Sequence, residues 1–126
     1  MGIRRVAAFT ITASVGKAEV TVIPLSSSSG DLSANIDRWR GQVGLPPGGD
    51  AYQPKTTMID GVASLVIDLS GPAPADGHPT RMIMAIRTEG KTSWFFKILG
   101  TDDVVAAQKD AFEAFLSSVK FSAAAR

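Results

Sequence analysis

The residues with the clearest capacity for chemistry lie between positions 38 and 42, where Arg38 and Arg40 flank Trp39 and Gln42 follows. This group combines two planar cations, an amphipathic aromatic ring and an amide beside a proline-rich loop, and Tyr52 comes soon after that loop. Protein interfaces favour Trp, Tyr and Arg. We therefore predict that these five residues form a site for a small-molecule ligand or a partner protein.

The same residues also fit a purely structural role. Trp39 falls on an apolar helical stripe, so it can pack a helix on a sheet while Gln42 holds the following loop. A nucleic-acid partner is not expected. Although Trp39 between two arginines resembles a base-stacking site, basic residues are otherwise scattered and the net charge is only +1.

Catalysis by a nucleophile depends on His78, because it is the one histidine in the sequence. A hydrolase would need His78 as general base, with a serine from the run 26–29 or a loop carboxylate such as Asp76. No Gly-x-Ser-x-Gly sequence is present to hold such a serine. A hydrolase based on His78 is therefore the alternative hypothesis, and no catalytic residue is assigned.

Metal and cofactor sites find little support in the sequence. Zinc sites use several Cys and His ligands, whereas this chain has no cysteine and one histidine. Walker and dinucleotide-binding glycine patterns are missing as well. Asp60 fits a tight turn and Asp68 the polar face of a strand, so neither indicates a catalytic pair. We predict no metal and no cofactor.

These candidates must be positioned by one domain covering residues 1–126, in which 44% of residues are hydrophobic and 20% charged. Alternating apolar and polar residues predict six strands. In the second, Ala18, Val20 and Val22 alternate with Lys17, Glu19 and Thr21. The expected strands are 4–13, 17–25, 56–59, 62–69, 81–88 and 92–99.

Helical spacing of apolar residues predicts two helices. One begins near position 31, carries Leu32, Ile36, Trp39 and Val43 on one face, and ends at Gly41 or Gly44. The other begins at 101–102 with Thr101 or Asp102 as a cap, and repeats Val105, Phe112, Leu116 and Val119.

Strands and helices do not alternate singly, so a parallel sheet is not expected. Asp60-Gly61 is a strong signal for a two-residue hairpin. Trp94, Phe96 and Ile98 alternate with Phe95, which predicts a central strand covered on both faces. We expect an α+β fold in which two helices pack on a single antiparallel sheet of about six strands. Met58, Met82 and Met84 are expected in its core.

The closing segment runs from the aromatic strand 94–98 through the helix 106–116 to Ser118-Val119-Lys120-Phe121. It resembles domains of the Mog1/PsbP-like fold, which are α+β sandwiches around an antiparallel sheet. The stretch 35–47 is similar to a sequence found in uncharacterised, often exported bacterial proteins. These resemblances imply an accessory or binding role outside the cytoplasm and no defined reaction.

No run of apolar residues is long enough for a membrane-spanning helix. The leading hypothesis is therefore a non-catalytic binding or assembly module of the bacterial cell envelope, extracytoplasmic and without a transmembrane segment. Its partner would be an unidentified protein or small molecule. The hydrolase based on His78 is the alternative, and a purely structural domain of a larger exported protein is the third possibility.

Overall fold

A computed structural model describes residues 7–13, 16–26, 32–48, 53–72 and 79–120 of the chain. Six strands and two helices occur in these ranges, in the order strand, strand, helix, four strands, helix. The elements are β1 (Ala7–Ala13), β2 (Gly16–Ser26), α1 (Leu32–Gln42), β3 (Lys55–Ile59), β4 (Val62–Gly71), β5 (Thr80–Glu89), β6 (Thr92–Thr101) and α2 (Asp102–Ser118).

All six strands form one sheet in the order β1-β2-β6-β5-β4-β3, and every neighbouring pair is antiparallel. β5 and β6 are central, which confirms the expectation for the aromatic strand. Asp60 and Gly61 have φ values of 46° and 80° and join β3 to β4. Positive φ at both positions is the signature of a type I′ turn, and the two-residue hairpin predicted at Asp60-Gly61 is confirmed.

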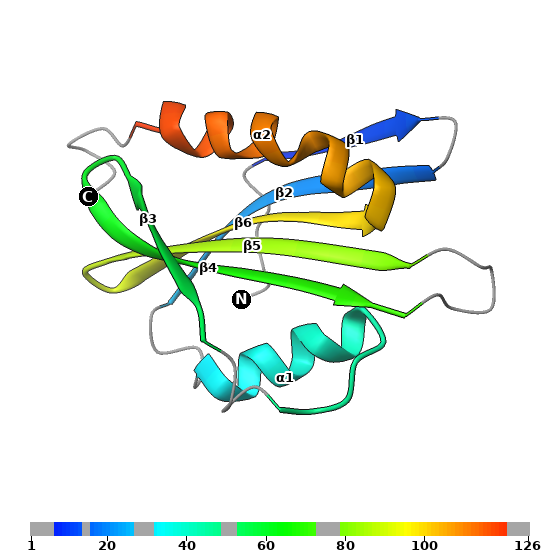
Figure 1. Ribbon diagram of the computed structural model, residues 1–126. Helices are drawn as coiled ribbons and strands as arrows, with labels where there is room; N and C mark the ends of the chain where they lie inside the picture. Colours follow the sequence, from blue (N-terminus) through cyan, green and yellow to red (C-terminus); the bar gives the residue numbers. More distant parts are fainter. Residues whose placement is uncertain (1–6, 14–15, 27–31, 49–52, 73–78, 121–126) are drawn as a thin grey trace.

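The two helices cover opposite faces of the sheet (Figure 1). The face under α2 carries Val20 of β2, Ile83 of β5, and Phe96 and Ile98 of β6, all buried against Phe112 and its neighbours on the helix. Because successive side chains of a strand point to opposite faces, the intervening residues of the same strands form a second core. The sheet is therefore covered on both sides along its central strands.

The second core lies under α1. Ile36, Trp39 and Val43 of the predicted helical stripe are buried there against side chains of the central strands. The Trp39 and Phe95 rings meet edge to face, with centroids 6.1 Å apart. Trp39 thus anchors α1 on the sheet, and its neighbours on the helix take their positions from that contact. The other buried members of this core are Ile67, Leu69, Met82, Met84 and Ile86.

The expected α+β class, the single antiparallel sheet and the two packed helices are confirmed. The prediction that Met58 belongs to the core is wrong, because its side chain is 57% exposed. Met58 lies on the edge strand β3 and pairs with exposed Ala63, where neither helix covers it. Thr101 occupies the N-cap position of α2, but its side chain makes no capping hydrogen bond.

Gly44 terminates α1, as expected for one of the two glycines, Gly41 and Gly44, that were predicted to end this helix. Gly44 has a φ of 83°, its amide donates to the Gly41 carbonyl, and the Leu45 amide donates to the Arg40 carbonyl at 2.8 Å. This pair of hydrogen bonds defines a Schellman motif, which favours glycine at the left-handed position. The motif turns the chain sharply back along the helix.

Candidate functional site

A cavity with a volume of about 540 Å³ lies between α1 and the sheet. Pockets for small molecules fall in the range of roughly 300–1,000 Å³. Strands β2, β5 and β6 form one wall, and one side of α1 forms the other. The lining residues are Thr21, Ile23, Leu25, Asn35, Arg38, Trp39, Gln42, Met84, Phe95 and Lys97.

The register of β2 and β6 orders the sheet wall of this cavity. Thr21 is directly opposite Lys97, and Ile23 is directly opposite Phe95. Residues opposite each other in an antiparallel pair have Cβ atoms about 5 Å apart. The polar pair Thr21 and Lys97 is therefore followed by the apolar pair Ile23 and Phe95, and Leu25 extends the apolar part.

The helical wall contributes a second cation. Arg38 lies three residues after Asn35 on α1, and its Nη2 donates a hydrogen bond to Asn35 Oδ1. Residues three apart on a helix are neighbours on its surface. Asn35 is buried whereas Arg38 is exposed, so the amide holds the guanidinium at the rim of the cavity. The contact uses one of the five N–H groups of the guanidinium.

The predicted site residues divide into three groups. Arg38, Trp39 and Gln42 all line the cavity. Arg40 does not, because the helix turns its side chain toward the following loop. Tyr52 lies outside the described residues. The structure thus brings three of the five predicted residues together at one cavity.

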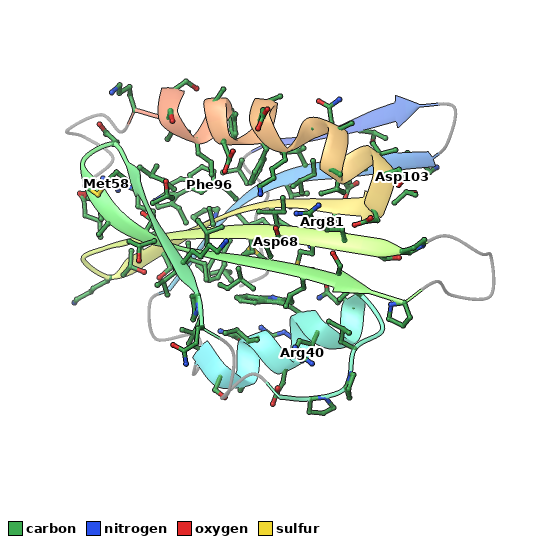
Figure 2. The ribbon with its side chains drawn as sticks, viewed as in Figure 1. Arg40, Met58, Asp68, Arg81, Phe96 and Asp103 are labelled. Carbon is green, nitrogen blue, oxygen red and sulfur yellow. The ribbon has the colours of Figure 1, made fainter. Side chains whose placement is uncertain are left out.

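Arg40 holds the loop that follows α1 (Figure 2). Its Nε donates to the Pro46 carbonyl at 2.7 Å, and its guanidinium lies beside Gly48. Asp37 adds to this contact by accepting a hydrogen bond from the Gly48 amide at 2.8 Å. Two side chains of α1 therefore fasten the proline loop to the helix, which is the role the sequence analysis had considered for Gln42.

These contacts lead to different expectations for the two arginines. We expect Arg40→Met to lower the free energy of unfolding by about 0.5–1 kcal/mol, because an exposed hydrogen bond is lost. Ligand affinity at the cavity should stay unchanged. Arg38→Met should lower the free energy of unfolding by about 1 kcal/mol, because buried Asn35 loses its hydrogen-bond donor, and it should also weaken the binding of an anionic ligand. Urea denaturation and titration calorimetry on both variants measure the two effects, and weaker binding only in Arg40→Met would contradict this assignment.

Three polar residues of the cavity were not predicted from the sequence, namely Thr21, Asn35 and Lys97. Thr21 is 1% exposed, although its alternation with apolar neighbours suggested a solvent-facing position. Lys97 follows the aromatic residues of β6, and in the sequence it has the position of a polar residue in an alternating strand. A charged residue in a strand covered on both faces was the one available signal, since such a charge must be accommodated by a polar neighbour or water.

A second groove lies under α2 and has a volume of about 170 Å³. Asp68 borders it and forms a two-point ion pair with Arg81, at 2.9 Å from Nε and 2.6 Å from Nη2. The hydrogen bonds that Arg81 donates to the Asp68 carboxylate raise the pKa of Arg81 above its ordinary value. This pair joins β4 to β5 (Figure 2), so Asp68 has the structural role expected of a carboxylate on a strand face.

The residues of the alternative hydrolase cannot be placed together. Asp76 and His78 lie outside the described residues, as do Ser27–Ser29. In the described ranges, no group of three or more His, Cys, Asp or Glu side chains is arranged to hold a metal ion. The described helices include none long and apolar enough to cross a membrane.

Comparison with known proteins gives a likeness in fold. No protein-family model matches the sequence, and no curated protein matches it significantly. The crystal structure of PA94 from Pseudomonas aeruginosa, a protein of unknown function for which a regulatory role has been suggested, is similar with a TM-score of 0.65. The similarity covers 97% of this chain and 85% of that one at 10% sequence identity. At this identity the two proteins share a fold, and the likeness carries no activity from one to the other.

Proposed function

We propose that this protein is a non-catalytic binding module that holds a small molecule in the cavity between α1 and the sheet. The observation that carries the proposal is the cavity itself. It has the volume of a ligand site, and three residues that the sequence had singled out line it together with four further apolar side chains. Ligand sites combine a mostly apolar lining with a few placed polar groups.

The chemistry of the lining supports binding rather than turnover. Among the described residues, the ten lining side chains contain a hydroxyl, two amides, two cations and apolar groups, but no carboxylate and no imidazole. Carboxylates and imidazoles are the commonest general acids and bases in enzymes. The polar groups present can donate hydrogen bonds and offer positive charge, which orients a ligand without activating it.

The proposal also places the protein in a family and a compartment. The sandwich of two helices around an antiparallel sheet supports membership of the Mog1/PsbP-like group, to which the segments 94–98 and 106–121 pointed. The similarity of the stretch 35–47 to exported bacterial proteins supports a location in the cell envelope. In that setting the module would present its ligand to an assembly partner.

The experiment that tests the function is a thermal-shift screen with a cavity-filling variant. The purified protein is screened against sugars, nucleotides, amino acids, organic acids and lipids. A ligand at 100 times its Kd adds about 2.7 kcal/mol, which raises the Tm by several degrees for a domain of this size. We expect a dose-dependent shift that disappears in Gln42→Trp, because the indole would enter the cavity from the exposed end of α1.

A matched substitution separates filling of the cavity from a general effect of tryptophan. Gln108→Trp places the same side chain on α2, on the opposite face of the sheet, and should keep every shift. If ligand shifts persist in Gln42→Trp, or if no compound on the panel raises the Tm, the cavity is not a small-molecule site.

A further inference from the structure

The cavity contains a buried polar group that has no partner among the described residues. Thr21 is 1% exposed, and its Oγ1 makes no hydrogen bond to any residue in the described ranges. Buried hydroxyl groups are almost always hydrogen-bonded, since an unsatisfied one costs free energy. Thr21 lines the cavity, so a bound molecule with a polar atom at this position would satisfy it.

The charge around Thr21 indicates the kind of atom that binds there. Lys97 lies directly opposite Thr21 in the sheet, and its side chain carries an ammonium group. Arg38 lines the same cavity from α1. Glu19 lies on the same face of β2, two residues from Thr21 and opposite Leu99, and it is not among the lining residues. The described lining thus carries two cationic side chains and no acidic one, a composition that complements an anion.

Beyond Thr21 and Lys97, the lining of the cavity is apolar in the direction of Leu25. From these two residues the cavity passes the Ile23–Phe95 pair and reaches Leu25. Leu25 is four positions after Thr21 in β2, which corresponds to about 13 Å at roughly 3.3 Å per residue. Trp39 and Met84 border the same space. An unbranched apolar tail fits this path better than a polar ring.

We propose that the ligand is an amphipathic anion, with negatively charged oxygens on an unbranched apolar tail. Its head accepts a hydrogen bond from Thr21 Oγ1 and contacts the Lys97 ammonium, while Arg38 closes over it from α1. Its tail lies along Ile23, Phe95 and Leu25. This inference rests on the proposed function and adds the class of ligand. A fatty acid and an alkyl phosphate share this chemistry.

Titration calorimetry with four ten-carbon probes tests the class of ligand on the full chain, below the concentrations at which the probes form micelles. Decanoate and decyl phosphate carry the proposed anionic head, and their relative Kd values identify the preferred one. Decan-1-ol lacks the charge, and decyltrimethylammonium reverses it. We expect at least one anion to bind about tenfold or more tightly than both controls, because hydrogen bonds and contacts to a charged group are lost in the controls.

Two variants test whether the Thr21 hydroxyl and the Lys97 ammonium contact the anionic head of the ligand. Thr21→Val keeps the shape of the side chain and removes the hydroxyl, so it should weaken anion binding about tenfold or more while the Tm of the free protein stays the same or rises. Lys97→Met should weaken binding to a similar extent. Lys91→Met, in the exposed turn between β5 and β6, is the matched control and should bind as tightly as the unchanged protein.

The outcomes separate the two proposals. Equal affinity for decan-1-ol and the anions, or full anion affinity in Thr21→Val, overturns the amphipathic anion. The proposed function still stands in that case if another compound raises the Tm and loses this effect in Gln42→Trp. If no compound passes that screen, both proposals fail. A loss of Tm in Thr21→Val would show that its hydroxyl already has a partner within the chain, which also overturns the inference.

Discussion

Replacing Gly71 with alanine is expected to lower the free energy of unfolding by about 3 kcal/mol or more. A Cβ atom at this position would lie 1.4 Å from the carbonyl oxygen of Val43. This oxygen belongs to the backbone just after α1, and the Val43 side chain is only 2% exposed. The clash cannot be relieved by rotating a side chain, so the end of α1 must move away from β4.

Urea denaturation measures the loss, as a lower midpoint with little change in slope. Gly41→Ala is a matched control, because this glycine lies within α1 and a Cβ there meets nothing within 4 Å. Alanine is favoured over glycine in a helix by up to about 1 kcal/mol, so this variant should be more stable than the unchanged protein. Equal stability of the two variants would contradict the close contact between α1 and β4.

The same displacement should affect ligand binding. Gly71 is far along the chain from the cavity, yet the contact with Val43 sets how closely α1 approaches the sheet. Arg38, Trp39 and Gln42 are carried by this helix and form one wall of the cavity. We therefore expect Gly71→Ala to weaken any ligand held between α1 and the sheet, even under conditions where the protein is still folded.

Arg87→Met is expected to lower the free energy of unfolding by about 1–3 kcal/mol, because a buried carbonyl loses its hydrogen-bond donor. The Arg87 side chain is 1% exposed. Its Nε donates to the Ile59 carbonyl at 2.8 Å, and its Nη2 lies 3.0 Å from Glu89 Oε2. Methionine keeps much of the volume, so the loss reflects the polar contacts and the buried Ile59 carbonyl that is left behind.

Glu89→Gln separates the two contacts of Arg87. The Glu89 side chain is 32% exposed, so water compensates for much of the lost ion pair and a change below about 1 kcal/mol is expected. Urea denaturation of both variants gives the comparison. An equally large loss in Glu89→Gln would mean that the ion pair, rather than the hydrogen bond to Ile59, holds β5 to the turn between β3 and β4.

The local elements of this protein follow from the sequence because their signals are local. Alternation in 62–69 and 92–99 and the helical stripe through Ile36 and Trp39 depend only on residues close in the chain. The Asp60-Gly61 turn is equally local, since its backbone requires positive φ values. Trp39 could be assigned to both packing and a site, and the structure shows it buried on the sheet and bordering the cavity.

Other features depended on residues far apart in sequence. Nothing near Met58 indicates that β3 is an edge strand, since that depends on the order of strands in the sheet. The placement of the helices on opposite faces likewise depends on how each connection crosses the sheet. Arg40 was grouped with Arg38 because both flank Trp39, but neighbours on a helix point in different directions, and Arg40 contacts Pro46 instead.

The sequence alone thus determined the strands, the helices, the antiparallel class and one side of the candidate site. Only the tertiary structure showed the other side, because Thr21 and Lys97 are 76 positions apart and meet through the register of β2 and β6. By alternation alone Thr21 reads as a residue facing water. It becomes a buried hydroxyl because α1, which follows it in the chain, packs over that face of the sheet and encloses the cavity.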